Sequence, residues 1–266
     1  MSTSMKPNDI LYDDLYELKS GRWVLKPNFP RLSGIGTRAF WNDPIFEYKG
    51  FAIKYFVGPR EIEMAELAGD CGVKVHGHVV RFDVPPDNQP REVGFVMEIA
   101  RPLVDYIKTI KDESEKHRIK EEMIAVLEEL HTRYNMVHGD VKPLNFVICK
   151  DGKIRLCDFE CARPVDEKTE VWEFLCHESE ITTSTDRYHN KTRYHYVPPT
   201  KDDDWYALAI SIWELYTGKV PFDTIESGED MRSHHKTGQT VDLMEVKDDA
   251  TREWIRRILR KGGASV

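Results

Sequence analysis

Short apolar runs separated by polar stretches characterise the first hundred residues. Residues 51–56 and 95–99 are two such runs, and their alternation of inward and outward positions predicts β-strands. Residues 60–68 lie between them and are rich in Glu, Met, Ala and Leu, which favours a helix. Gly69 and Gly72 follow as helix stop signals. The first part of the chain is therefore predicted to be strand-rich.

After residue 102 the apolar positions change to a helical period. A helix that runs towards Tyr134 is predicted, because apolar side chains recur every three or four residues. These are Ile119, Met123, Val126, Leu127 and Leu130. Residues 205–216 are apolar on nearly every face, which predicts a buried helix that ends near Gly218 and Pro221. Residues 251–259 are predicted to form one more helix.

A hairpin is predicted between these helical segments. Residues 146–149 and 154–157 are apolar, and Lys150-Asp151-Gly152-Lys153 joins them with an Asp-Gly turn. Strands first and helices afterwards indicate the α+β class. Residues 12–18 could be a short amphipathic helix packed on the first part or a mobile tail, and the sequence does not decide between the two.

Composition and charge narrow the function. The chain has 266 residues, of which 40% are hydrophobic and 32% charged, and a net charge of −8. This balance gives no support to a nucleic-acid surface, and no apolar run is long enough for a membrane span. No secretory signal is seen at the start. Five cysteines without framework spacing suggest reduced thiols in a cytosolic or nuclear protein. A zinc site around Cys161, Cys176 and His177 is disfavoured because no close cysteine pair anchors it.

Candidate chemistry is concentrated in the loop from His138 to Asn145. Asp140, Lys142 and Asn145 place a carboxylate, an ammonium and an amide on one short segment, and Asp158 adds a second carboxylate thirteen residues past the amide. Phosphoryl transfer from a metal–nucleotide complex needs such groups. The alternative is that these residues make ordinary turn hydrogen bonds.

With these residues in view, the chain resembles the protein kinase superfamily over about residues 30–222. Several motifs occur in the order that this family has. They are Gly34-Ile35-Gly36-Thr37-Arg38-Ala39, Ala52-Ile53-Lys54, Met97-Glu98-Ile99-Ala100, His138-Gly139-Asp140, Asp158-Phe159-Glu160, Tyr196-Val197-Pro198-Pro199 and Asp204-Trp205-Tyr206-Ala207-Leu208. The resemblance implies an α+β, two-lobed fold in a single domain over 1–266, with an N-lobe over about 20–98, a hinge at 98–102 and a C-lobe over 102–262.

The resemblance also implies ATP and Mg²⁺ as cofactors and a protein as substrate. Asp140 would accept the proton of the attacking hydroxyl. Lys142 would neutralise charge on the transferred phosphoryl group. Asn145 and Asp158 would bind the metal. Asp204 would cap the start of its helix and hold the backbone near His138.

The nucleotide site follows from the same resemblance. Lys54 would contact the first phosphates, and Gly34 and Gly36 would let backbone amides approach the phosphates. Ala52 and Val147 would lie at the nucleotide, and Glu98 and Ala100 would bind adenine through their backbones. Glu63 is predicted to orient Lys54, because Leu67 would pack under it on the same helix face. Glu61 and Glu66 are its competitors.

Several positions depart from the family pattern. Gly139 stands where an arginine usually receives an activation-segment phosphate, so we expect activity without prior phosphorylation. Glu160 replaces a glycine that eases the motion of Phe159. Thr200 replaces a glutamate, and few residues follow Phe222, so the region of the peptide-docking helices is short. Ala39 and Trp41 replace the third glycine and a valine of the phosphate loop.

Three functions remain open at this stage. The first is an ATP-dependent Ser/Thr protein kinase, which Lys142 and the helix after Asp204 favour. The second is a small-molecule kinase similar to the aminoglycoside and choline kinases, which Gly139 and Glu160 favour. The third is a kinase-shaped scaffold with little turnover, which Ala39, Trp41 and Thr200 favour. The presence of Lys54, Asp140, Asn145 and Asp158 argues against the third.

Overall fold

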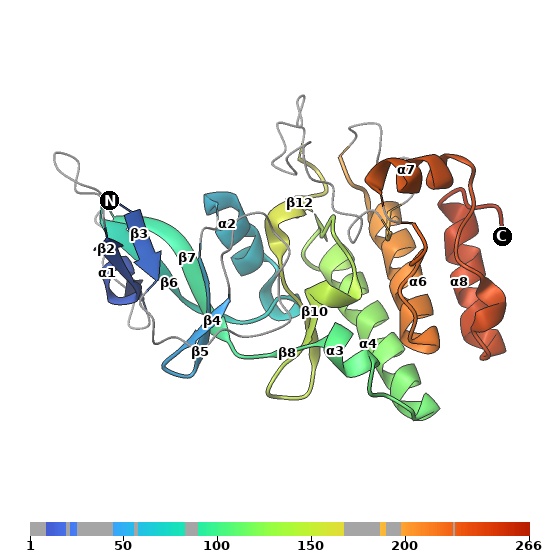
Figure 1. Cartoon of the computed structure of the whole chain (residues 1–266), viewed down its shortest axis with the longest axis horizontal. Helices are drawn as coiled ribbons and strands as arrows, with labels where there is room; N and C mark the ends of the chain where they lie inside the picture. Colours follow the sequence, from blue (N-terminus) through green and yellow to red (C-terminus); the bar gives the residue numbers. More distant parts are fainter. Residues whose placement is uncertain are drawn as a thin grey trace.

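A five-stranded sheet forms one end of the molecule and helices form the other (Figure 1). The computed structural model describes residues 9–19, 22–25, 45–55, 58–82, 90–167, 187–189, 198–225 and 227–266. The strands of this sheet follow the order β1-β6-β7-β5-β4. They are β1 (Ile10–Leu11), β4 (Phe46–Tyr48), β5 (Phe51–Tyr55), β6 (Val75–Phe82) and β7 (Pro90–Glu98). A separate hairpin joins β2 (Tyr16–Lys19) to β3 (Arg22–Leu25).

Helix α2 (Pro59–Leu67) lies between β5 and β6 in the chain and carries part of the site. Proline at its first position fits the helix start, because the missing N–H would have no intrahelical acceptor there. Gly69 has φ +54° and opens the 3₁₀ turn η1 (Gly69–Cys71). The helix predicted over residues 60–68 and the two predicted strands are therefore confirmed.

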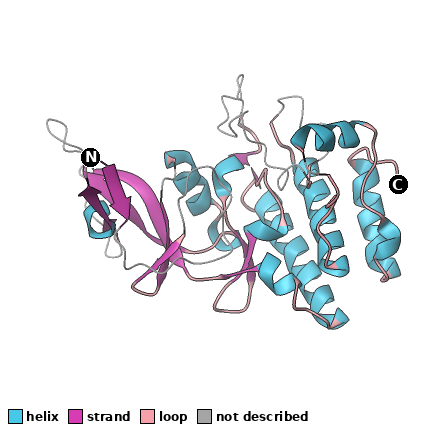
Figure 2. Cartoon of the chain, viewed as in Figure 1, coloured by secondary structure: helices cyan, strands magenta, loops and turns pink. Residues whose placement is uncertain are grey.

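The second part of the chain is mainly helical. Its elements are β8 (Arg101–Pro102), α3 (Leu103–Ile107), α4 (Glu113–Thr132), β9 (Met136–Val137), η2 (Pro143–Asn145), β10 (Phe146–Ile148), β11 (Ile154–Leu156), η3 (Phe159–Cys161), β12 (Arg163–Pro164), α6 (Lys201–Thr217), α7 (Gly228–Lys236), η5 (Leu243–Glu245) and α8 (Asp249–Lys261). Strands β10 and β11 form the predicted hairpin, and Gly152 in its turn has φ +81°. Figure 2 shows strands gathered in one lobe and helices in the other, which confirms the two-lobed α+β fold.

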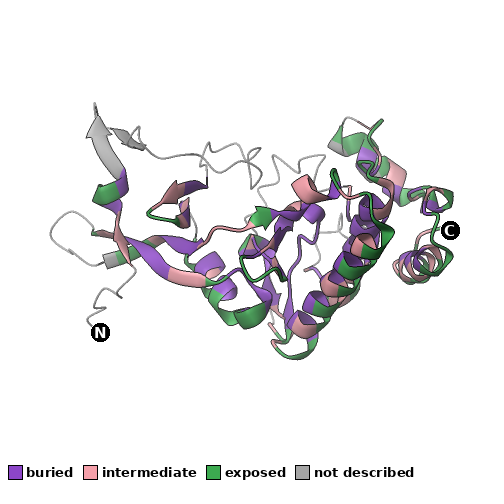
Figure 3. Ribbon diagram, turned by 90° about the horizontal axis from the view of Figure 1, so that it is seen from below, coloured by how far each residue is buried: buried purple, intermediate pink, exposed green. Residues whose placement is uncertain are grey.

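Helix α6 is the centre of the larger lobe. From Asp204 to Leu215 nearly every residue is buried, because α4 and α8 both pack against it. Figure 3 shows buried residues concentrated in the interior of the molecule and exposed ones along the outer sides of the helices. The helix begins at Lys201, one turn earlier than the predicted start at Trp205, and its N-cap is Thr200, which forms a capping box with Asp203. The prediction that Asp204 caps this helix is therefore wrong.

The N-terminal segment docks on the smaller lobe. Strand β1 pairs in parallel with β6, and helix α1 (Tyr12–Leu15) buries Tyr12 and Leu15. Both side chains belong to an apolar cluster with Phe46, Ile53 and Tyr55 of the sheet. Of the two alternatives for residues 12–18, packing on the lobe is therefore the one observed, although the helix itself ends at Leu15.

Candidate active site

Lys54 is the centre of a three-residue charge cluster between the lobes. Its Nζ lies 2.5 Å from Oε1 of Glu61 on α2 and 2.6 Å from Oδ1 of Asp158, which follows β11. Asp158 has φ +66° and ψ +66°, a left-handed conformation that is uncommon outside glycine. The predicted meeting of Lys54 and Asp158, which lie 104 positions apart in the chain, is confirmed.

The carboxylate that pairs with Lys54 on α2 differs from the prediction. Glu61 is 5% exposed and makes the ion pair, whereas Glu63 is exposed to solvent. Leu67, which was expected to pack under Glu63, is 49% exposed. The choice of Glu63 is therefore wrong, because α2 turns the face that carries Glu63 and Leu67 outward and buries the one that carries Glu61.

Burial and pairing act in opposite directions on the ionisation of this cluster. Burial alone would lower the pKa of Lys54, but the charges of Asp158 and Glu61 raise it above its ordinary value. Burial would raise the pKa of Asp158, but the charge of Lys54 holds it below its ordinary value. Burial raises the pKa of Glu61, and Lys54 only partly offsets that effect. Lys54 is therefore charged across the physiological range and Asp158 is ionised beside it.

Glu61→Gln and Glu63→Gln form a matched test of this correction. We expect Glu61→Gln to lower kcat/KM for the phosphoryl transfer that the resemblance implies by about 10- to 100-fold, because a misplaced Lys54 would no longer orient the phosphates. Glu63→Gln should leave kcat/KM close to the wild-type value. Steady-state kinetics of the two variants measure the difference, and the reverse ranking would restore Glu63 as the partner.

The loop from His138 to Asn145 collects three predicted groups at one point. Lys142 Nζ donates to Oδ2 of Asp140 at 2.7 Å. Asn145 Nδ2 donates to the same Oδ2 at 3.0 Å and to the Asp140 carbonyl at 2.8 Å. Because the nitrogen of this amide donates, its oxygen is the atom that could bind a cation. Asp140 and Lys142 are close enough to act on the ionisation of Asp158, so the two charge clusters are neighbours.

A buried carboxylate of α6 fixes the backbone of this loop. Asp204 is 1% exposed and accepts hydrogen bonds from the backbone N–H groups of His138 and Gly139, each at 2.8 Å. The imidazole Nε2 of His131 on α4 lies 2.9 Å from the same carboxylate. The prediction that Asp204 holds the backbone near His138 is therefore confirmed.

His138 also connects the loop to the segment that carries Asp158. Its Nδ1 accepts from the Asp140 N–H at 3.3 Å, so Nε2 carries the proton and donates to the Cys157 carbonyl at 3.0 Å. The ring of Phe159 packs beside it with centroids 5.0 Å apart. His138 thereby contacts the residues on both sides of Asp158, the backbone of Cys157 and the ring of Phe159.

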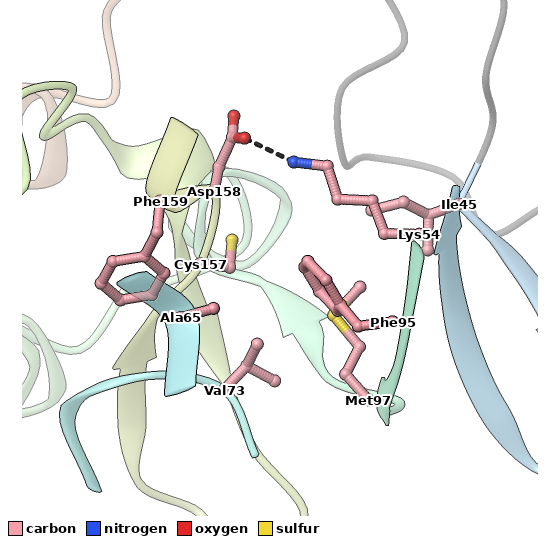
Figure 4. Close-up of a pocket in the computed structure, with 9 residues that line it drawn as sticks. All are labelled: Ile45, Lys54, Ala65, Val73, Phe95, Met97, Cys157, Asp158 and Phe159. Atoms are coloured by element: carbon pink, nitrogen blue, oxygen red, sulfur yellow. Dashed lines mark hydrogen bonds and ion pairs between the residues drawn. The ribbon is translucent and has the colours of Figure 1, made fainter. Parts of the chain in front are cut away.

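Apolar residues from both lobes lie next to Lys54. Figure 4 shows a cleft in which the side chains of Lys54 and Asp158 point toward each other above Phe95, Met97 and Cys157. Its empty space, open mouth included, is about 280 Å³. Its lining residues are Ile45, Lys54, Ala65, Val73, Phe95, Met97, Cys157, Asp158 and Phe159.

The predicted base-binding residues lie in the same region. Ala52 of β5 and Val147 of β10 belong to one buried apolar cluster, against which Ala100 packs. Glu98 ends β7, and its carboxylate lies 3.9 Å from the guanidinium of Arg155 in the β10–β11 hairpin. The structure thus brings Ala52, Val147 and the predicted hinge at Glu98 and Ala100 into one region. The motif residues Gly34, Gly36, Ala39, Trp41, Tyr196 and Val197 lie outside the described residues.

The backbone conformation and close contacts of Gly139 explain why this loop lacks an arginine before Asp140. Its φ is +79°, and a Cβ there would lie 2.6 Å from the Cys161 carbonyl oxygen and 3.0 Å from Pro199 Cγ. Backbone cannot give way as a flexible side chain can, so an arginine is excluded from this position unless the loop shifts. The close approach is a structural reason for the departure seen in the sequence.

Three arginines around the segment after Asp158 are already paired with oxygen atoms. Arg60 at the start of α2 binds both oxygens of Glu167, at 2.9 and 2.5 Å. Arg163 donates to the backbone carbonyls of Pro164 and Glu167, and Arg187 to those of Pro221 and Ile225. Sequence reasoning missed the Arg60–Glu167 pair, because its partners are 107 positions apart.

Tyr188 and Glu214 form a buried pair that attaches the short segment 187–189 to α6. The Tyr188 hydroxyl donates to Oε2 of Glu214, which is 6% exposed. Burial raises the pKa of Glu214 to about 7, and the hydrogen bond from Tyr188 only partly offsets it. Glu214 therefore binds a proton more tightly in the folded protein than in the unfolded chain.

Glu214→Gln should remove one part of the pH dependence of stability. Protonated Glu214 stabilises the fold fully below pH 4.5, and this contribution is lost as the pH rises through about 7. A shift from 4.5 to about 7 corresponds to roughly 3 kcal/mol. Urea unfolding of the wild type across this range should show that slope, and Glu214→Gln should lack it. Glu229→Gln on the exposed side of α7 is the control, and an unchanged slope in Glu214→Gln would contradict the assignment.

Metal chemistry at this site would rely on few ligands. Asn145 and Asp158 offer an amide and a carboxylate oxygen, the ligand types that Mg²⁺ takes together with substrate phosphates and water. Within the described residues, no group of three or more His, Cys, Asp or Glu side chains could hold a metal ion. Cys176 and His177 of the disfavoured zinc site lie outside those residues. Among the helices that the structure describes, none is both long and apolar enough for a membrane span.

Comparison with known proteins agrees with the fold. Residues 59–261 match the family model of the protein kinase domain, and the chain belongs to this family. It is 26% identical over 180 residues to developmentally-regulated protein kinase 1 of Dictyostelium discoideum, covering 65% of this chain and 23% of that protein. It is 30% identical over 130 residues to the serine/threonine-protein kinase PrkC of Bacillus subtilis, covering 46% of this chain and 18% of that protein. These matches span about a fifth of each relative's length.

Proposed function

We propose that this protein is an ATP-dependent kinase that transfers the γ-phosphate to a Ser or Thr hydroxyl of a protein substrate. The observation that carries the proposal is that two charge clusters lie close together. Asp140, Lys142 and Asn145 of one loop form the first, and Lys54 and Asp158, which line the cleft, belong to the second. The relatives named as serine/threonine-protein kinases support the choice of acceptor.

Each group has a role that its surroundings support. Asp140 would accept the hydroxyl proton, and Lys142, already at its carboxylate, would offset charge on the transferred phosphoryl group. Lys54, oriented by Glu61, would contact the ATP phosphates. Asn145 and Asp158 would hold Mg²⁺, which supplies charge neutralisation at the phosphates. Ala52, Val147 and the backbone near Glu98 and Ala100 would receive the base.

Labelled ATP with magnesium tests this function against the alternatives. The protein is incubated alone, with a generic basic protein, and with pools of small alcohols and amines, beside Asp140→Asn. We expect label on protein that is lost in the variant. Label confined to the small-molecule pool would support the second candidate and overturn the first. Thermal stabilisation by nucleotide without any transfer would indicate a scaffold.

We further propose that activity does not require phosphorylation of the activation segment. Gly139 stands where the family usually has an arginine, and a side chain there would collide with the Cys161 carbonyl. Arg60 pairs with the carboxylate of Glu167, and Arg163 with carbonyl oxygens. Arg60 at the start of α2 is thus already paired with a carboxylate of the chain itself, so no phosphate is needed to neutralise it.

Phosphatase treatment should leave the activity within about two-fold of the untreated value, because no phosphate is needed to order the segment. The quadruple alanine variant of Thr182, Thr183, Ser184 and Thr185 should behave in the same way; these four residues lie outside the described residues. Phosphate analysis of the treated sample is the control. Activity that appears only after treatment with another kinase would contradict the proposal.

A further inference from the structure

His78 is a buried histidine that faces carboxylates from three different elements. It lies in the middle of β6 and is 1% exposed. Its ring Nε2 is 3.1 Å from Oε1 of Glu66 on α2, and its Nδ1 is 3.2 Å from Oε1 of Glu92 on β7. Asp9, in the N-terminal segment, accepts from the His78 backbone N–H at 2.9 Å and lies 3.8 Å from Nδ1.

Both ring nitrogens of His78 lie close to a carboxylate oxygen, one from α2 and the other from β7. A buried polar ring is tolerated where polar groups surround it in this way. These are close polar contacts rather than well-aligned hydrogen bonds. His78 thereby lies between the N-terminal segment and α2 and contacts both.

The same N-terminal segment also touches the strand that carries Lys54. Tyr12 stacks on Tyr55 with ring centroids 5.1 Å apart, and Tyr55 directly follows Lys54 in β5. On the other side, Glu66 lies five residues after Glu61 on α2. Residues 9–15 therefore contact the strand that holds the ammonium and, through His78, the helix that holds its carboxylate.

We infer that Asp9 and His78 are positioning residues of the active site, and that docking of residues 9–15 sets the orientation of α2 and thus the Lys54–Glu61 pair. The inference rests on the proposed kinase function. A short helix turned about its axis would carry Glu61 away from Lys54. Arg60 and Glu61 form ion pairs in the first turn of α2, and Glu66 contacts His78 near its C-terminal end. Loss of the Glu66–His78 contact would loosen the C-terminal end of α2.

Three variants remove a carboxylate or the imidazole of this contact with little change in shape: Asp9→Asn, His78→Gln and Glu66→Gln. Glu63→Gln, on the exposed face of the same helix, is the matched control. We expect the backbone amides of α2 to exchange hydrogen about 10-fold faster in the three variants than in the control. kcat should fall about 5- to 10-fold, with KM for the protein acceptor unchanged, because the change acts on the Lys54–Glu61 pair and the acceptor is expected at Asp140. The double variant Asp9→Asn/His78→Gln should have about the same kcat as His78→Gln alone, because both substitutions break the same connection.

The two readouts separate this inference from the proposed function. If the wild type transfers no phosphate, the kinase function fails while faster α2 exchange in Asp9→Asn would still support the coupling. If the wild type is active but Asp9→Asn and His78→Gln show control-like exchange and kcat, the positioning role is overturned. Equal effects in Glu63→Gln would overturn it as well. Asp9→Asn keeps the test valid if His78→Gln fails to fold, because an asparagine oxygen can still accept from the His78 N–H.

Discussion

Asp140→Asn is expected to lower the rate of phosphoryl transfer by roughly 10²- to 10⁴-fold, the usual contribution of a positioned general base. The carboxylate is fixed by Lys142 and Asn145, at 2.7 and 3.0 Å from its Oδ2. An asparagine of the same size retains an oxygen for one of these donors but cannot accept the hydroxyl proton. The loss should therefore appear in kcat, with KM for ATP little changed, because Asp140 is expected to act on the acceptor and not on the nucleotide.

Asp70→Asn is the control for this experiment. The Asp70 side chain in η1 is 83% exposed and lies at a long distance, 3.8 Å, from the exposed Arg133, so loss of its charge should leave kcat unaltered. Nucleotide-dependent thermal stabilisation of Asp140→Asn shows whether the cleft still binds ATP. A variant with wild-type kcat would exclude Asp140 as the base, and a loss of nucleotide binding would assign it to the nucleotide site instead.

The catalytic loop could be predicted because the chemistry restricts which residues can serve. A carboxylate, an ammonium and an amide within six residues have few other uses at that spacing, and the structure gathers Asp140, Lys142 and Asn145 around one oxygen atom. The hairpin after them was visible for a local reason, since an Asp-Gly turn needs the positive φ that Gly152 shows. Both predictions depend only on residues that are close together in the chain.

The rotation of α2 could not be predicted in the same way. Three glutamates on a nine-residue helix offer three faces, and Leu67 suggested that the face of Glu63 is buried. The structure exposes Leu67 and buries Ala65 and Ala68. Ala65 and Ala68 follow Glu61 at helical spacing, so these two small residues were the signal that the face of Glu61 is buried. Small residues suit a helix that approaches the rest of the protein closely, as α2 approaches η3.

Pairs between residues that lie far apart in the chain could not be predicted from the sequence either. His78 and Asp9 are 69 positions apart, and Tyr188 and Glu214 are 26 apart. Neither pair belongs to a periodic pattern, and each depends on how several elements pack. Asp204 was an intermediate case, because its place before an apolar helix suggested a cap, whereas the cap is Thr200 and the carboxylate of Asp204 points to the catalytic loop.

The second large effect, on the free energy of unfolding, is expected from substitution of the Asp204 carboxylate. Asp204→Asn should lower the free energy of unfolding by about 3 kcal/mol, because one oxygen becomes an NH₂ group facing buried donors. Oδ1 accepts from Gly139, and Oδ2 accepts from His138 and faces His131 Nε2. Whichever way the amide turns, at least one buried backbone N–H loses its acceptor. Urea unfolding at constant pH measures the difference.

Asp202→Asn on the same helix separates this effect from a general loss of negative charge. Asp202 is exposed and pairs with the exposed Lys261 at 2.6 Å, a kind of contact that contributes at most about 1 kcal/mol. We therefore expect Asp202→Asn to be nearly neutral in stability and in kcat. In Asp204→Asn, kcat should fall at least about 10-fold even at temperatures where the variant is fully folded, because the backbone of His138 and Gly139 positions Asp140. A variant that loses stability but keeps wild-type kcat would show that this anchor supports the fold without positioning the base.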